Sequence, residues 1–344
     1  MNKSSKTFNL MLPFNIIWLR MLAIFLVYLG HSELHLGGGY GATFFLTLSG
    51  YIFTRLFLQD QVHGQEVYFL DFLSQRILKV FPTITTLVFV SIFTKSALHL
   101  KVDFLQVLSV LTFTSNYYNS YYGHPNNGLA HLWTLSVYMQ FIVIYFVIFK
   151  YLKSRKKLTI FFILLSLFCL GYRSLLVTMN LGTSSYIYNS LETRIDALSI
   201  GALLALNIEY FYEHHFYSWL KHPMAFGVNL VLIYFIGQLV PHWRNSFGFS
   251  IHAIFYGVLI YQVLNYNSFL IRDRYYKTLS LLCFWFYFFH PWAFIIGHKL
   301  PFDRAWQVLM GALIFVVSMI GFILIREKSK IYFVSNWKRF QKIN

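Results

Sequence analysis

The sequence predicts an all-α membrane protein, a polytopic bundle of about ten transmembrane helices with both termini in the cytoplasm. Three observations favour this class. The chain has 344 residues, of which 57% are hydrophobic and only 12% are charged, whereas soluble domains carry about 25% charged residues. Apolar runs long enough to cross a bilayer recur along the chain. Lys and Arg lie in short segments between these runs, so the net charge of +16 indicates membrane topology rather than nucleic-acid binding.

Ten apolar runs approach or reach the roughly 20 residues that a transmembrane helix needs. The segment 104–114 is apolar but too short, and we expect it to be re-entrant or interfacial. The whole chain, residues 1–344, is expected to form a single integral membrane domain, with a cytoplasmic N-terminus at 1–13 and a basic cytoplasmic tail at 327–344. The expected spans are 14–29, 40–58, 79–98, 131–150, 158–178, 192–208, 223–240, 249–265, 279–297 and 305–325.

The distribution of Lys and Arg orients the chain. With both termini inside, 21 of the 28 basic residues fall on the cytoplasmic side and 7 on the outer side, as the positive-inside rule requires. Arg20 interrupts the first run and no small-residue cleavage site follows it, so we do not expect a cleaved signal peptide. We expect a multi-pass protein of the bacterial inner (plasma) membrane.

Cysteine chemistry is not expected to define the site. Cys169 and Cys283 each lie inside an apolar run and far from one another. Neither a disulfide framework nor a zinc pattern has this spacing. Both thiols are therefore expected to be small buried side chains.

The first span contains an arginine and ends near a histidine. Arg20 and His31 are 11 residues apart, which places them on one helical face about 16 Å apart along the axis. An arginine inside a span needs a phosphate, a carboxylate or a water-filled cavity. The alternative is an arginine that snorkels from a helix end, with His31 in an interfacial loop.

Several other polar side chains also interrupt or border the apolar runs. Glu33 and His35 follow His31 in a glycine-rich turn, which favours acid–base chemistry over a metal site, although an ordinary loop has the same composition. Arg76 and Lys79 share a helical face at the cytoplasmic rim, which suits a phosphate or headgroup but equally reflects topology. Further such residues are His131, Trp133, Arg194, Asp196 and His290. Because Arg194 and Asp196 are two residues apart, each is expected to pair with another helix.

Six of these segments occur in the order typical of the acyltransferase-3 family of integral membrane acyltransferases, which the chain resembles over nearly its whole length. The motifs are Arg20 with His31 ten intervening residues later, the second span ending in Ser49-Gly50-Tyr51, the basic segment 76–82, His131-Leu132-Trp133, Arg194-Ile195-Asp196, and His290-Pro291.

The resemblance implies an O-acyltransferase of the O-acetyltransferase type. Its members are expected to move an acyl group, often acetyl, from cytoplasmic acyl-CoA to a hydroxyl of a cell-surface or lipid-linked carbohydrate, a polysaccharide modification. Acyl-CoA would be a co-substrate, with no cofactor bound permanently and no metal. The expected partners are acyl-CoA, the glycan acceptor and membrane lipids, and not nucleic acid.

The chemistry assigns roles to these residues. His31 is the expected general base, since a neutral imidazole can take the proton of an attacking hydroxyl, although a transient acyl-histidine is also open. Arg20 would bind phosphates or stabilise the oxyanion, and Arg76 and Lys79 would bind the donor. The supporting residues are Glu33, Ser49, Trp133 as a stacking face for a sugar, Arg194, Asp196 and His290.

The chain departs from the family pattern at two usually acidic positions, where it has Thr43 and Tyr138, and Glu33 is a candidate substitute. Lys79 stands where arginine is common. We expect no appended hydrolase-like extracytoplasmic domain. A transporter or flippase for a polar or lipid-linked solute would use intramembrane Arg, His and Asp equally well, but no inverted repeat is evident. A purely structural subunit would leave the buried arginine without a purpose.

Overall fold

The structure, a computed structural model, is built from helices, with no strand in the residues that it describes. These residues are 14–31, 40–62, 69–97, 99–125, 128–265, 273–297, 300–314, 316–317 and 319–320. The all-α class is confirmed for these segments. The expected terminal segments 1–13 and 327–344, and the turn that contains Glu33 and His35, lie outside them.

The helices run from one end of the described chain to the other. They are α1 (Phe14–His31), α2 (Tyr40–Val62), α3 (Phe69–Ala97), α4 (Phe104–Leu111), α5 (Ser115–Tyr122), η1 (Ala130–Leu132), α6 (Trp133–Tyr151), α7 (Arg155–Thr178), α8 (Ser184–Asn189), α9 (Leu191–Glu213), η2 (His215–Lys221), α10 (Pro223–Gly237), α11 (Pro241–Trp243), η3 (Arg244–Gly248), α12 (Phe249–Asn265) and α13 (Asp273–Gly297). Residues 304–314, most of which lie in the last expected span, are also helical.

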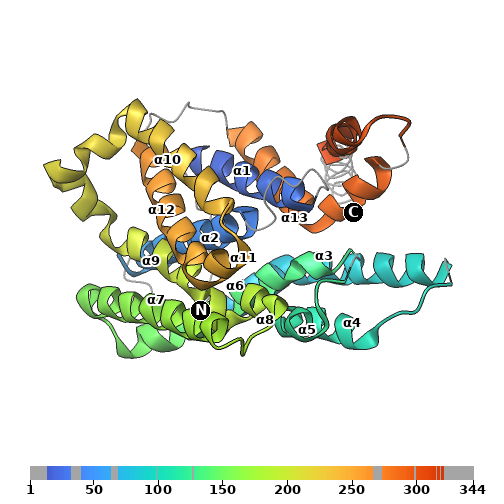
Figure 1. Cartoon of the computed structure of the whole chain (residues 1–344), viewed down its shortest axis with the longest axis horizontal. Coiled ribbons are helices and arrows are strands. Elements are labelled where there is room, and N and C mark those ends of the chain that lie inside the picture. The colour runs from blue at the N-terminus through green and yellow to red at the C-terminus, as the bar shows by residue number, and fades with distance from the viewer. Residues whose placement is uncertain are drawn as a thin grey trace, which may run out of the picture.

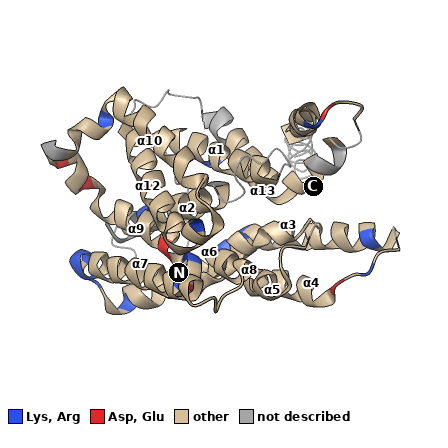
Figure 2. Ribbon diagram, viewed as in Figure 1, with Lys and Arg blue, Asp and Glu red and all other residues tan. Residues whose placement is uncertain are grey.

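Six helical segments within the described residues are long and apolar enough to cross a membrane. They are Gly41–Leu58, Phe72–Ala97, Ala130–Tyr151, Arg155–Thr178, Ser184–Glu213 and Pro241–Asn265. Two shorter apolar helices are Asn15–His31 and Pro223–Gly237. The chain is therefore a multi-pass membrane protein, while the count of ten spans and the cytoplasmic termini stay predictions. Figure 2 marks the charged residues on the ribbon, with basic residues in blue at one end of α7.

The third helix begins earlier than expected. α3 starts at Phe69 rather than at residue 79, and Pro82 lies inside it. The polar residues before 79 end the apolar run but not the helix, because hydrogen bonding along the backbone does not require apolar side chains. Arg76 and Lys79 therefore lie within α3.

The apolar segment 104–114 forms a short helix and then a turn. Asp103 caps α4, with its carboxylate accepting hydrogen bonds from the amides of Leu105 and Gln106. α4 ends at Leu111, and Phe113 has a positive φ of 55°, which breaks the helix before α5 begins. Because α4 has only 8 residues, it cannot span a bilayer.

α2 and α9 pack together at the centre of the bundle. α7 and α12 flank α9, and α1 packs against both α2 and α13 (Figure 1). Glycines permit the central contact. A Cβ on Gly50 would lie 2.1 Å from the carbonyl oxygen of Leu198, and one on Gly201 would lie 2.0 Å from that of Thr47. Small residues at both crossing points let the two backbones touch.

Candidate active site

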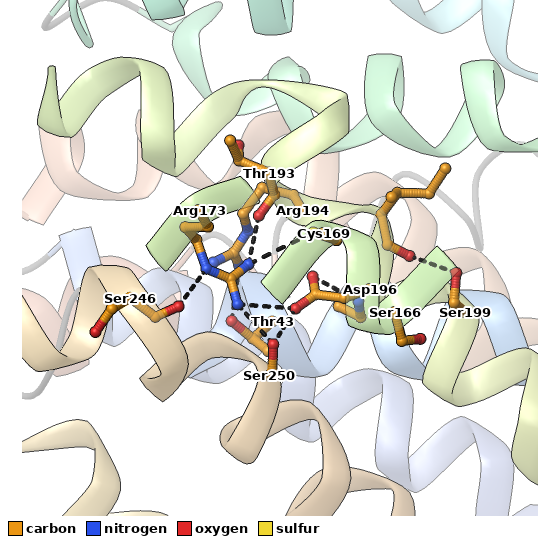
Figure 3. A network of polar contacts seen from close by, with 12 residues as sticks. Thr43, Ser166, Cys169, Arg173, Thr193, Arg194, Asp196, Ser199, Ser246 and Ser250 are labelled. Atoms are coloured by element: carbon orange, nitrogen blue, oxygen red, sulfur yellow. Dashed lines mark hydrogen bonds and ion pairs between the residues drawn. The ribbon is translucent and has the colours of Figure 1, made fainter. Parts of the chain in front are cut away.

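A buried ion pair joins α7 to α9. Arg173 Nη2 lies 3.0 Å from Asp196 Oδ2, and neither side chain is more than 1% exposed. The same carboxylate oxygen accepts a hydrogen bond from the hydroxyl of Ser250 on α12 at 2.5 Å. The expectation that Asp196 pairs with a different helix is confirmed, and three helices are tied together at this point (Figure 3).

Arg173 is the residue of this network that sequence reasoning missed. Its guanidinium also donates to the backbone carbonyls of Ser246 at 2.7 Å and Thr193 at 2.5 Å. The sulfur of Cys169, which is buried as expected, accepts a hydrogen bond from Nη1 of Arg173 at 3.7 Å. The available signal was its position well inside the apolar run 158–178, where an arginine needs a partner.

Arg194 is completely buried beside this ion pair. Its Nη2 donates to Thr43 Oγ1 on α2 at 2.7 Å, which confirms that it too bonds to another helix. Its Nε and Nη1 have no hydrogen-bond partner within the described structure. The guanidinium carbon instead lies 3.9 Å from the ring centre of Phe249, a cation–π contact. Since Asp196 pairs with Arg173, Arg194 leaves this cluster with one net positive charge.

Trp133 lies against Arg194 rather than in an open groove. It is 3% exposed, its ring centre is 5.0 Å from that of Tyr188, and the Arg194 guanidinium lies 5.8 Å from its ring. Trp133 is therefore buried in this structure, and its role as a stacking face for a sugar stays a prediction. Trp133, Tyr188 and Phe249 together form an aromatic wall around the buried guanidinium of Arg194.

Three histidines from distant segments meet beside the end of α1. The ring centre of His290 on α13 is 5.4 Å from that of His31 on α1 and 4.8 Å from that of His131 on η1. His290 and His131 are buried, with exposures of 0% and 4%, whereas His31 is exposed. One accessible imidazole therefore lies beside two buried ones.

His124 is a fourth member of this region that no sequence motif pointed to. It lies in the loop between α5 and η1 and is exposed, and its ring centre is 6.3 Å from that of Trp133. The charge of His31 acts on His124, His131 and His290 alike. The histidine cluster, meaning these four residues, therefore forms one electrostatic unit adjacent to the aromatic wall.

The proposed donor-binding cations lie elsewhere, on α1 and α3. Arg20 and Arg76 both act electrostatically on Lys79, so the three residues occupy one region. Arg20 and Arg76 are half-buried and Lys79 is exposed. Because α1 is a continuous helix from Phe14 to His31, Arg20 lies about 16 Å along the axis from His31, on the same face.

The roles of all the candidate site residues stay predictions, including those of the two supporting residues not yet described. Ser49 is half-buried on α2, one residue before the glycine that contacts α9, and Glu33 lies outside the described residues. No group of three or more His, Cys, Asp or Glu side chains in the described part of the chain has metal-binding geometry.

Comparison with known proteins gives one family and several relatives. The acyltransferase domain of the acyltransferase-3 family matches residues 14–327. YrhL of Bacillus subtilis (strain 168), provisionally named a peptidoglycan O-acetyltransferase, is 29% identical over 260 residues, which cover 68% of this chain and 40% of YrhL. The O-acetyltransferase OatA of Staphylococcus aureus (strain NCTC 8325) is 27% identical over 188 residues, which cover 49% of this chain and 30% of OatA. The chain therefore spans less than half the length of these relatives. No solved structure matches it significantly.

Proposed function

Because the chain belongs to the acyltransferase-3 family, we propose that it is an O-acyltransferase. It moves an acyl group, expected to be acetyl, from acyl-CoA to a hydroxyl of a cell-surface or lipid-linked carbohydrate. The names of YrhL and OatA support the transferred group, and that of YrhL supports a glycan acceptor. The main structural support is that His31, His131 and His290 lie close together. One of these three imidazoles is accessible and the other two are buried.

His31 acts as the general base in this proposal. A sugar hydroxyl is a poor nucleophile at neutral pH, and a positioned imidazole can remove its proton as the oxygen attacks the thioester carbonyl. The new C–O bond forms, the C–S bond breaks, and the thiolate of coenzyme A takes the proton back from His31. The exposure of His31 suits contact with both substrates. A route through an acyl-histidine would use the same residue.

Arg20, Arg76 and Lys79 bind the donor. Each carries a positive charge, and two of them act on the third, an arrangement that is costly unless an anion lies between them. Coenzyme A phosphates supply such an anion, and arginine binds phosphate through two parallel hydrogen bonds. The donor then enters from the cytoplasmic side of the inner membrane, and its pantetheine arm reaches along α1 towards His31.

The decisive experiment is mass analysis of surface glycans from cells that carry the wild-type protein, His31→Ala, or no protein. We expect O-acyl groups on the glycan only with the wild type, because a lost general base lowers the rate about a hundredfold or more. His214→Ala is the matched control, since His214 is also exposed but lies at the far end of α9.

Two outcomes would refute the proposal. Normal glycan acylation in His31→Ala would show that His31 is not the base. Unchanged acylation in cells without the protein, combined with altered export of a glycan precursor, would favour the transporter or flippase instead.

A further inference from the structure

His290 has a defined tautomer. Its Nδ1 lies 2.8 Å from the backbone carbonyl oxygen of Tyr287. A carbonyl can only accept a hydrogen bond, so Nδ1 must carry the hydrogen. In the neutral imidazole, Nε2 then has a lone pair and no hydrogen. This atom is buried and has no hydrogen-bond partner in the described structure.

A buried acceptor without a partner is destabilising, so its presence needs an explanation. Two imidazoles lie near this atom's ring. That of His131 is 4.8 Å away at an interplanar angle of 72° but is buried, whereas that of the exposed His31 is 5.4 Å away at an angle of 29°. At this separation two nearly parallel rings can meet edge to edge, since each ring nitrogen lies more than an ångström from its ring centre. A small rotation of the exposed His31 brings its N–H towards Nε2.

Among the residues that the structure describes, the titratable groups that contact His290 are histidines and a tyrosine. His31 and His131 are its neighbouring imidazoles, and the hydroxyl of Tyr287 forms a hydrogen bond with that of Thr134 at 2.9 Å. At the two positions where the family usually has an acidic residue, Thr43 is bonded to Arg194 and Tyr138 packs against Phe53.

We propose that Nε2 of His290 accepts a hydrogen bond from His31 when His31 has taken the proton of the acceptor hydroxyl, which makes His290 a positioning residue. This inference rests on the proposed function. In other enzymes a carboxylate orients the catalytic histidine and stabilises its imidazolium. Here a neutral imidazole does so. The transferred proton stays on His31 until the thiolate takes it, and His290 remains neutral throughout.

A neutral acceptor has a distinct consequence. A carboxylate beside His31 would favour its charged form, which cannot act as a base. A neutral acceptor orients the ring but favours the charged form less than a carboxylate does, so we expect activity to persist to lower pH. The chemistry of the residue at position 290 should therefore determine where the acidic limb of the rate profile lies.

The test uses the full-length protein in lipid nanodiscs, with acetyl-CoA and a soluble peptidoglycan fragment as probes. His290→Phe removes the acceptor, and kcat should fall about tenfold or more with KM unchanged, because the interaction is made only in the transition state. His290→Gln offers an amide oxygen and should recover most of kcat. His290→Glu introduces a carboxylate and should move the acidic limb to higher pH by about one unit or more.

The matched control is His252→Gln. His252 is also buried and its Nε2 is 2.8 Å from a backbone carbonyl, that of Ile233, so a general effect of removing such a histidine would appear there too. We expect no change in its pH profile. Thermal denaturation of each variant identifies any that fails to fold. If the Glu variant does, the comparison of His290→Gln with His290→Phe decides whether His290 acts as a hydrogen-bond acceptor.

Two results would overturn the inference: an acidic limb at the same pH in His290→Glu and the wild type, or a His290→Gln variant as impaired as His290→Phe. Either result with an inactive His31→Ala would refute only the role of His290. A fully active His31→Ala would refute the proposed function itself.

Discussion

Arg194 on α9 donates a hydrogen bond to Thr43 on α2, with 2.7 Å between Nη2 and Oγ1, and so a buried guanidinium has a neutral hydroxyl where an ion pair would be expected. Its remaining nitrogens, Nε and Nη1, lack partners in the described structure, and aromatic rings cover them. Cation–π contacts therefore help to stabilise this charge, which makes no direct ion pair in the described structure.

Thr43→Asp should stabilise the protein, because it places a carboxylate beside this guanidinium. Hydrogen bonds to charged groups contribute about 1.5–3 kcal/mol, so the thermal midpoint in detergent should rise. Thr43→Asn is the control, since it has a similar size and no charge. A Thr43→Asp variant less stable than Thr43→Asn would mean that the aromatic contacts already compensate the charge.

Asp196→Ala should be strongly destabilising. It would leave Arg173 and Arg194 buried together without a carboxylate, and removing one partner of a buried ion pair costs about 3–5 kcal/mol. The double variant Arg173→Met with Asp196→Leu should be more stable than Asp196→Ala, because no charge is left unpaired. Chemical denaturation of the purified variants measures this, and a double variant that is the least stable would contradict it.

Gly201→Ala should disrupt the contact between α2 and α9. A Cβ there would lie 2.0 Å from the backbone carbonyl oxygen of Thr47, and backbone atoms cannot move aside cheaply. We expect a lower yield of folded protein and a lower thermal midpoint. Gly171→Ala is the matched control, since a Cβ on Gly171 meets nothing within 4 Å. Equal stability of the two variants would show that the helices separate easily.

Arg20→Ala should abolish acyl transfer while leaving the protein inserted in the membrane, because the donor phosphates lose a binding group. Arg20→Lys should recover little, since lysine cannot make two parallel hydrogen bonds to a phosphate. Donor turnover at saturating and limiting acetyl-CoA separates binding from chemistry. Full activity in Arg20→Ala would mean that this arginine only snorkels to the membrane surface.

Acid should loosen α4 through its cap. The hydrogen bond from the Tyr118 hydroxyl lowers the pKa of the Asp103 carboxyl below its usual value. A lowered pKa in the folded state contributes stability that is present above the normal pKa and is lost as the pH falls through the lowered value. Tyr118→Phe removes this bond, so the loss should begin at higher pH.

Hydrogen exchange at the amides of Leu105 and Gln106, which bond to Asp103, reports this change directly. Asp103→Ala should cost about 1 kcal/mol at neutral pH, the usual contribution of a helix cap. An exchange profile that does not depend on pH in the wild type would rule out this role for Asp103.

Local sequence was sufficient to predict the all-α class and several of the side chains that do not belong in lipid, although it missed Arg173. An apolar run long enough to span a bilayer predicts a helix. An arginine such as Arg20 or Arg194 within such a run is conspicuous because a buried charge needs a partner. Boundaries were less certain, as α3 shows, because a helix continues through polar residues such as Arg76 without any change in its backbone bonding.

The partners were decided only by the tertiary structure. Arg173 and Asp196 are 23 residues apart, and His31 meets His290 from the opposite end of the chain. Helical periodicity specifies which residues share a face but not which helix lies opposite, because an apolar face packs equally well against lipid or against any other apolar helix. Close approach at Gly50 and Gly201 selects α2 and α9 as neighbours, and that choice brings Thr43 to Arg194.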